Sequence, residues 1–306
     1  MNSGGYSDGY TLGNSSETTM TFTGGSITTP NATTGRSTLT LSTSGGTVTF
    51  AVYVIDTNRM FILMTGAVEK AQSGDMRTQQ QSSYSGANLS GNFGLYWQGY
   101  GYENGGIAGY GTTVLQGTGD GAGNFTINQS YDDNNGTYAS GKEVGGPIPV
   151  NFDSSNPGRV WFSPGGGMIY MYFFNTNNAF FLMLNGGTPS SLDTGWLEPQ
   201  SQTTFTDAAL AGNYLFGQMP LMISTMNGTV REWDFDNAGN ITGTQTNAGP
   251  GAFMYDMPVT GTTYAWLSTT NGTFSATNRS CAVISATRAV CIGNTTPTPG
   301  VIILQQ

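Results

Sequence analysis

The sequence predicts an all-β protein made of tandem antiparallel β-barrel or β-sandwich repeats, the first of which is incomplete. Two observations predict this fold: the composition, and a set of markers that recurs along the chain in the same order. Only 9% of the 306 residues are charged, 12% are aromatic and 46 are Gly. Such a mixture disfavours helices and suits short strands joined by tight turns. The dense aromatic and β-branched runs are atypical of a disordered chain.

Four markers recur along the chain. An opening segment, Leu89–Leu95 (LSGNFGL), returns at Leu210–Phe216 (LAGNYLF). The others are a Gly-Asn turn (Gly121–Thr126 and Asn237–Thr242), an apolar hairpin (Tyr53–Leu63, Tyr172–Leu182 and Ala282–Ile292) and a closing strand that ends in Gln (Gly74–Gln79, Gly195–Gln200 and Gly300–Gln305). Ordered recurrence of this kind is the signature of repeat architectures. The markers divide the chain into an incomplete β repeat over residues 1–79 and two full β repeats over residues 80–200 and 201–306.

The first repeat is shorter than the other two. It contains the hairpin and the closing Gln79, but no clear opening segment and no mid-repeat turn. Three explanations stay open: the chain begins downstream of the true N-terminus, the first repeat has diverged, or another chain fills the gap.

Strand signals inside the repeats are short and closely spaced. β-Branched and aromatic runs that are bounded by turn residues lie at Thr38–Leu41, Thr47–Phe50, Phe125–Ile127, Val160–Phe162 and Thr229–Trp233. Asn-Gly pairs, which favour hairpin turns, lie at Asn135, Asn185, Asn227 and Asn271, and short helical turns are expected only near Ala67–Lys70 and Asp207–Leu210. The order of an opening Gly-Asn-aromatic step, a Gly-Asn turn and a long final hairpin resembles that of avidin- and lipocalin-type small barrels.

The apolar hairpins do not alternate apolar with polar residues, as strands with one wet face do. Met60–Met64, Met168–Phe174 and Ala179–Leu184 are apolar almost throughout. Two readings are open: central strands covered by loops of the same repeat, or packing against a neighbouring repeat or molecule. The second reading makes interface candidates of the middle hairpin and the C-terminal strand: Tyr172, Phe173, Phe174, Phe180, Phe181, Val301, Ile302, Ile303 and Leu304.

The two cysteines, Cys281 and Cys291, flank the third hairpin. A lone pair of cysteines in a chain that resembles exported proteins predicts a disulfide, with two buried thiols as the alternative. Asn-x-Ser/Thr sequons make possible glycosylation sites of Asn14, Asn31, Asn88, Asn124, Asn128, Asn135, Asn227, Asn240, Asn271, Asn278 and Asn294. The Thr- and Pro-rich stretch 294–299 is a candidate for O-linked sugar.

The composition excludes several function classes. The chain has no His, which removes the catalytic triads and zinc sites that depend on it, and no pair of carboxylates recurs between the repeats. Its net charge is −9 without a basic patch, so we expect no nucleic-acid partner. The longest apolar runs are too short to span a bilayer, so no membrane insertion is expected. Asp234–Asn240 partly matches a calcium loop but has Ala238 at a ligand position, which favours a solvated turn. We therefore expect neither an enzyme nor a bound cofactor or metal.

These features predict a structural subunit of an extracellular filament or surface assembly. The tandem β repeats resemble those of bacterial tandem-repeat cell-surface and extracellular filament proteins. This resemblance implies a homopolymer formed head to tail through contacts between β domains, with strand donation by residues 300–306 as one form of contact. A monomeric adhesin or carbohydrate-binding surface protein, with Tyr96, Trp97, Tyr100 and Tyr102 stacking on glycans, is the alternative, and a secreted hydrolase is the third reading.

Overall fold

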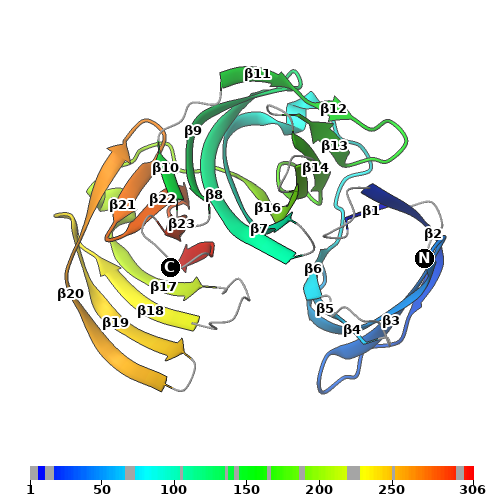
Figure 1. Ribbon diagram of the computed structural model, residues 1–306, viewed down its shortest axis with the longest axis horizontal. Coiled ribbons are helices and arrows are strands. Elements are labelled where there is room, and N and C mark those ends of the chain that lie inside the picture. Colours follow the sequence, from blue (N-terminus) through cyan, green and yellow to red (C-terminus); the bar gives the residue numbers. More distant parts are fainter. Residues whose placement is uncertain are drawn as a thin grey trace.

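The structure, a computed structural model, is all-β, with 70% of residues in strands and 3% in helices. It describes residues 6–10, 17–65, 73–103, 106–134, 137–140, 145–163, 167–185, 190–218, 228–249, 252–293 and 300–306. The strands form three sheets that follow one another along the chain. In Figure 1 the N-terminal sheet and the C-terminal barrel lie on opposite sides of the middle sheet.

The N-terminal sheet has six antiparallel strands in sequential order. They are β1 (Tyr6–Tyr10), β2 (Glu17–Ile27), β3 (Arg36–Thr43), β4 (Gly46–Asp56), β5 (Arg59–Met64) and β6 (Ser73–Arg77). Its two end strands, β1 and β6, do not pair with each other in the described part of the chain. This sheet is therefore curved but open (Figure 1).

The middle sheet has ten strands and is curled almost into a barrel (Figure 1). A 3-10 turn, Gly86–Asn88, precedes β7 (Ser90–Glu103), β8 (Gly106–Asp120), β9 (Asn124–Asn134), β10 (Thr137–Ser140), β11 (Gly145–Pro149), β12 (Asn151–Phe152), β13 (Arg159–Phe162), β14 (Gly167–Phe173), β15 (Ala179–Asn185) and β16 (Ser190–Pro199). Only Val150 separates β11, which pairs with β9, from β12, which pairs with β13. The sheet thus returns on itself around one apolar core that includes Phe93, Phe125 and Phe173.

The last eight strands form a closed barrel. Helix α1 (Asp207–Leu210) leads into β17 (Gly212–Gln218), β18 (Gly228–Phe235), β19 (Asn240–Gly249), β20 (Ala252–Ser268), β21 (Thr273–Ala276), β22 (Arg279–Ser285), β23 (Arg288–Gly293) and β24 (Ile302–Gln305). Strand β24 pairs with both β17 and β23, which closes the barrel. Trp233, Phe235 and Phe274 are fully buried inside it.

The strand predictions are confirmed at all five segments that we named, which fall within β3, β4, β9, β13 and β18. The helical turn at Asp207–Leu210 and the turn at Asn271-Gly272 are also present. Residues 67–70, 135–136 and 227 lie outside the described residues, as does Gly186. The closed barrel decides between barrel and sandwich for residues 212–305.

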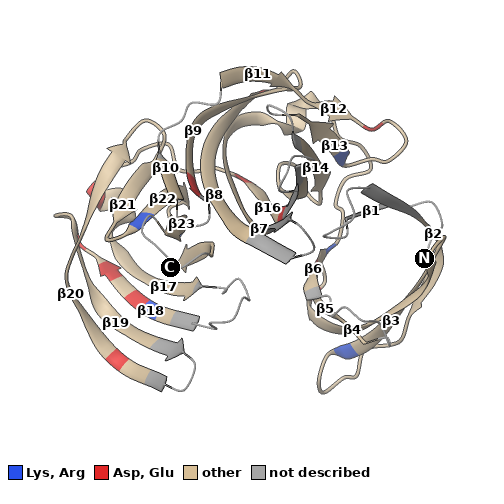
Figure 2. Cartoon of the chain, in the orientation of Figure 1, with Lys and Arg blue, Asp and Glu red and all other residues tan. Residues whose placement is uncertain are grey.

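Among the described residues, charged positions are thinly scattered over all three sheets (Figure 2). No described helix has the length and apolar character needed to cross a membrane.

Candidate assembly interface

The outer face of the β22–β23 hairpin packs against the outer face of the middle sheet. Four hairpin residues are completely or almost completely buried there: Ala282, Ile284, Val290 and Ile292. They form one apolar cluster with side chains from β7, β8 and β9, namely Tyr96, Val114 and Tyr131. Both faces of this hairpin are therefore buried, since Cys281 and Val283 face the barrel core. Its strands are apolar on both faces because one face packs in the barrel core and the other packs against the middle sheet.

A glycine on the middle sheet allows this close approach. A Cβ atom on Gly94 would lie 2.1 Å from the Cδ1 atom of Ile284. Any larger residue at Gly94 would force the two sheets apart or displace the Ile284 side chain. The two sheets can therefore pack this closely only because residue 94 is a glycine.

Polar contacts surround the apolar cluster. The Arg288 guanidinium forms an ion pair with Glu198 at 2.9 Å and donates a hydrogen bond to the Tyr96 hydroxyl at 3.0 Å. Burial, assisted by the Glu198 carboxylate, raises the pKa of Tyr96. On the opposite side, the Tyr131 hydroxyl donates to Thr273 at 3.1 Å. These contacts fix the register of two sheets that no shared strand connects.

A glutamine joins the middle sheet to the barrel. The Gln200 side chain is buried, and its Nε2 atom donates to the carbonyl oxygens of Asn271 (3.0 Å) and Val283 (2.7 Å). The next residue, Ser201, donates its backbone N–H to the carbonyl of Ile284. We call this contact the glutamine latch.

The junction between the N-terminal and middle sheets contains a second glutamine latch. The Nε2 atom of Gln79 donates to the carbonyl oxygens of Pro157 (2.8 Å) and Phe173 (3.0 Å). Gln80 then donates its backbone N–H to Phe174. Each latch thus binds the hairpin of the following sheet at matching positions, Phe173 in the middle sheet and Val283 in the barrel.

The three hairpins share one further hydrogen bond. The backbone N–H of Val54, Phe173 and Val283 donates to the carbonyl of Gly35, Gly158 and Gly272, at 3.1, 2.8 and 2.9 Å respectively. All three glycines have a positive φ, +66°, +90° and +70°, which favours glycine over any other residue. The same backbone geometry therefore occurs in all three sheets.

The hairpin of the N-terminal sheet has an uncovered apolar outer face. Tyr53, Ile55, Phe61 and Leu63 are 42–51% exposed. They occupy the outward positions of β4 and β5, as Ala282, Ile284, Val290 and Ile292 do on β22 and β23. We call this surface the head face. The expectation that both faces of Met60–Met64 are buried is not met within the chain, because no described sheet covers this one.

Two apolar side chains are exposed on the outer surface of the barrel. Leu215 on β17 and Val230 on β18 are 65% and 63% exposed. Val230 pairs with Gly217 in the barrel, and Val114 pairs with Tyr96 in the middle sheet. Leu215 lies two residues before Gly217, and Gly94 lies two residues before Tyr96. Leu215 therefore occupies the position in the barrel that Gly94 occupies in the middle sheet. We call this outer surface of β17 and β18 the tail face.

The other predicted interface residues are divided between surfaces and cores. Phe173 and Phe181 belong to the core of the middle sheet, and Ile302 and Leu304 to that of the barrel. Val301 lies in the cluster between the sheets, whereas Ile303 faces outward and is partly buried. Tyr172, Phe174 and Phe180 are partly buried on the outer side of their hairpin, where the Arg77 guanidinium lies 5.7 Å from the Phe174 ring centre.

The structure also corrects the alignment of the last closing strand. Gln305 pairs with Leu215 as Glu198 pairs with Gly94. Gln305 thus stands at the position of Glu198, two residues before that of Gln200. The sequence alignment of the two closing strands relied on their final glutamines alone. In the structure, Leu197 of β16 and Leu304 of β24 are the residues at matching register positions.

Cys281 and Cys291 form a buried disulfide across β22 and β23, which is compatible with an extracellular location.

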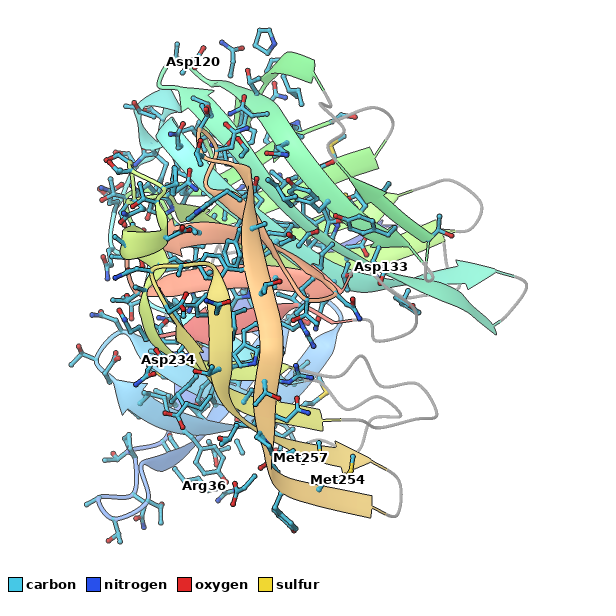
Figure 3. The ribbon with its side chains drawn as sticks, turned by 90° about the vertical axis from the view of Figure 1, so that its left-hand side faces the viewer. Arg36, Asp120, Asp133, Asp234, Met254 and Met257 are labelled. Carbon is cyan, nitrogen blue, oxygen red and sulfur yellow. A yellow bond between two sulfur atoms is a disulfide. The ribbon has the colours of Figure 1, made fainter. Side chains whose placement is uncertain are left out.

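The predicted solvated turn is present: the Asp236 carboxylate accepts the backbone N–H groups of Ala238 and Asn240, each at 2.8 Å. Asp120 forms the same turn with Ala122 and Asn124, and Figure 3 places Asp120 at the tip of the middle sheet. Among the described residues, no group of His, Cys, Asp or Glu could hold a metal ion.

The sequons differ in accessibility. Asn31, Asn240 and Asn278 are exposed, whereas Asn88, Asn124, Asn128 and Asn271 are partly buried. The partly buried amides, and that of Asn240, donate hydrogen bonds to neighbouring residues. Asn14, Asn135, Asn227, Asn294 and the Thr- and Pro-rich stretch 294–299 lie outside the described residues.

Two of the four aromatic residues proposed to stack on glycans can be placed, and neither ring is fully exposed. Tyr96 is buried at the interface, and the Trp97 ring packs edge-on against Phe181 at 5.3 Å. The side chains of Tyr100 and Tyr102 lie outside the described set.

Sequence reasoning did not identify the head and tail faces. It selected the middle hairpin for its dense aromatic residues, although the first hairpin is the more exposed one. The signal was the difference between the matched segments, in which Leu215 stands where the middle sheet has Gly94. Comparison of the chain with protein-family models, curated proteins and solved structures finds no match.

Proposed function

We propose that this protein is a structural subunit of an extracellular assembly, and that copies polymerise head to tail. The observation that carries the proposal is the pair of faces left bare at the two ends of the chain. The head face has the backbone positions of the covered β22–β23 surface, and the tail face has those of the β7–β8 surface that covers it. The tail face of one copy would cover the head face of the next.

The proposal includes the inference that the three sheets are repeats of one unit, the first of them incomplete. The glycine hydrogen bond in all three hairpins, the two glutamine latches and the two Asp turns support it. The middle sheet and the barrel already form one such junction within the chain. A junction between chains would bring the corresponding faces together, with different side-chain packing where Leu215 replaces Gly94.

At one pair of matched positions the residue sizes on the two bare faces are complementary. In the internal junction, a large residue on the middle sheet, Tyr96, accompanies the small Ala282 on the hairpin. On the bare faces the corresponding residues are Gly217 and Tyr53, so that the large residue lies on the hairpin instead. A Cβ atom on Gly217 would have no atom within 4 Å, which leaves room for a tyrosine ring.

Exposed apolar patches mark interaction sites, and a heterologous contact that does not close into a ring produces a filament. The head-to-tail contact uses two different surfaces, so it is heterologous. Strand β24 is hydrogen-bonded on both edges within its own barrel. The proposed contact therefore packs face on face and requires no donated strand.

Sedimentation velocity and negative-stain electron microscopy of the full chain test this function. We expect polymers that lengthen with protein concentration. Ile55→Asp on the head face or Leu215→Asp on the tail face should each give monomers that melt at the temperature of the unmodified chain diluted to its monomeric state. Leu267→Asp, which changes a half-exposed residue on β20 outside both faces, is the matched control and should still polymerise. A chain that remains monomeric at high concentration would refute the proposal.

A further inference from the structure

Two arginines point into the C-terminal barrel at the same end. Arg231 on β18 follows the inward alternation of Trp233 and Phe235, and Arg279 on β22 follows that of Cys281 and Val283. Both guanidiniums lie over the same two rings. The Phe216 ring centre is 5.1 Å from each of them, and the Trp233 ring centre is 5.7 Å from Arg231 and 5.4 Å from Arg279.

Neither arginine has an anionic partner within the described part of the chain. The Nε atoms of Arg231 and Arg279 and the Nε1 atom of the fully buried Trp233 are all inaccessible to solvent and lack a hydrogen-bond acceptor. The acidic residues on the same strand, Glu232 and Asp234, are exposed on the outer side. Four connections join the strands at this end of the barrel: 219–227, 250–251, 277–278 and 294–301. Their sequences contain no Asp or Glu.

Two unpaired cations at close quarters in a protein interior are unfavourable. Burial, together with the positive charge of Arg231, lowers the pKa of Arg279 to about 9. Buried charges are normally paired or bound to a counterion. The aromatic faces offset part of this cost through cation–π attraction, but they accept no N–H hydrogen bond from the buried Nε atoms.

The middle sheet shows that the fold does not require arginine at these positions. Leu115 lies opposite Leu95 in the middle sheet, as Arg231 lies opposite Phe216 in the barrel. Ile169 precedes Met171 on β14 by two residues, as Arg279 precedes Cys281 on β22. Leu95, Leu115 and Ile169 form an apolar core there. The two charges are thus an addition to the barrel.

We propose that Arg231, Arg279 and Trp233 form a binding site for a small anion with several oxygen atoms, a carboxylate or an inorganic oxoanion. Guanidinium groups bind such anions through paired N–H donors, and the faces of the Phe216 and Trp233 rings position the two guanidinium groups. Gln245 pairs across the sheet with both Arg231 and Met257, so Met257 marks the barrel end that contains the site (Figure 3). The site is separate from the head and tail faces and is independent of the proposed assembly.

Thermal shift and isothermal titration calorimetry with sulfate, phosphate and succinate, at ionic strength matched with chloride, test the site. A bound anion stabilises the folded state by mass action, so we expect a saturable heat of binding and a melting temperature that rises with the logarithm of the anion concentration, by roughly 5 °C at about a hundredfold excess over Kd. Tighter binding of sulfate or phosphate would identify an inorganic oxoanion as the ligand type. Tighter binding of succinate would identify an organic acid, and either result supports the site.

Arg279→Ile and Arg231→Leu introduce the residues of the middle sheet and should weaken anion binding at least about tenfold. Without anion, each variant should melt at or above the temperature of the unmodified chain, because an unpaired charge is removed. Arg36→Leu, on β3, is the control and should bind as the unmodified chain does. Absence of any anion effect beyond that of chloride would overturn the proposal. So would two arginine variants that retain binding.

Discussion

The hairpins β4–β5 and β22–β23 have the same backbone geometry but opposite surroundings. Each donates a backbone N–H hydrogen bond to a glycine carbonyl, and each is apolar on both faces. On β22–β23 the outer face is almost completely buried under β7, β8 and β9, whereas the outer residues of β4–β5 are nearly half exposed. On β22–β23 the apolar outer face is a docking surface within the chain, and we propose the same role for the outer face of β4–β5. In one case the chain itself supplies the partner.

The matched isoleucines of the two hairpins should respond very differently to a charge. Ile284→Asp buries a carboxylate without a partner, and we expect a loss of about 3–5 kcal/mol in the free energy of unfolding. Ile55→Asp changes a residue that is 51% exposed and should alter monomer stability by less than about 0.5 kcal/mol. Urea unfolding of both variants measures the difference. Equal losses in the free energy of unfolding would show that the two outer faces do not differ in burial.

The disulfide distinguishes the two hairpins on their inner faces. Val52 and Ile62 form the directly opposed pair in the N-terminal sheet, where the barrel has Cys281 and Cys291. The disulfide closes a loop with a sequence separation of 10, so its loss should cost about 2–3 kcal/mol in the chain-entropy model. Reduction should therefore lower the melting temperature of the barrel and leave the N-terminal sheet unaffected. Two free thiols in oxidised protein, detected by mass spectrometry, would remove this prediction.

The two glutamine latches should differ in strength because their burial differs. Gln200 is 7% exposed, and Gln200→Ala leaves two carbonyls without their side-chain donor, at a cost of about 1–2 kcal/mol. Gln79 is exposed, so water can replace its side chain, and Gln79→Ala should cost less than about 1 kcal/mol. Chemical denaturation compares the two losses, and a larger loss for Gln79→Ala would contradict this ranking.

The matched Asp turns should give the smallest effect. Hydrogen bonds from Asn124 and Asn240 lower the pKa of Asp120 and of Asp236, respectively. A carboxyl group whose pKa is lower in the folded state than in the unfolded state stabilises the fold at any pH above its unfolded-state pKa. This stabilisation is lost as the pH falls through the folded-state pKa. Stability should thus decline slightly below about pH 4, and Asp120→Asn with Asp236→Asn should flatten that decline. An unchanged slope in the double variant would show that these turns do not contribute to it.

The sequence was sufficient to predict the strands, the three hairpins and the pairing of Cys281 with Cys291, because each depends on local pattern. The sequence left barrel and sandwich open, because closure depends on β24 pairing with β17, the first strand of the barrel, which is distant in sequence. The arginines of the barrel were missed for a related reason. Arg231 and Arg279 are 48 positions apart in the sequence, and only the inward alternation of two non-adjacent strands brings them over the same rings.

The bare faces were also beyond sequence reasoning, because exposure is a property of the assembled sheets. Leu215 and Ile55 belong to strands whose residues read as ordinary core. Gly94 and Ile284 occupy the matching positions and are covered by a neighbouring sheet. Only comparison with them shows that Leu215 and Ile55 have no such cover in the described part of the chain.

A mixing experiment with two blocked variants tests the head-to-tail contact most directly. Ile55→Asp leaves only the tail face able to bind, and Leu215→Asp leaves only the head face. Each variant alone should sediment as a monomer, and an equimolar mixture should form a dimer of one copy of each and nothing larger. A mixture that remains monomeric, or either variant forming polymers alone, would contradict the head-to-tail contact.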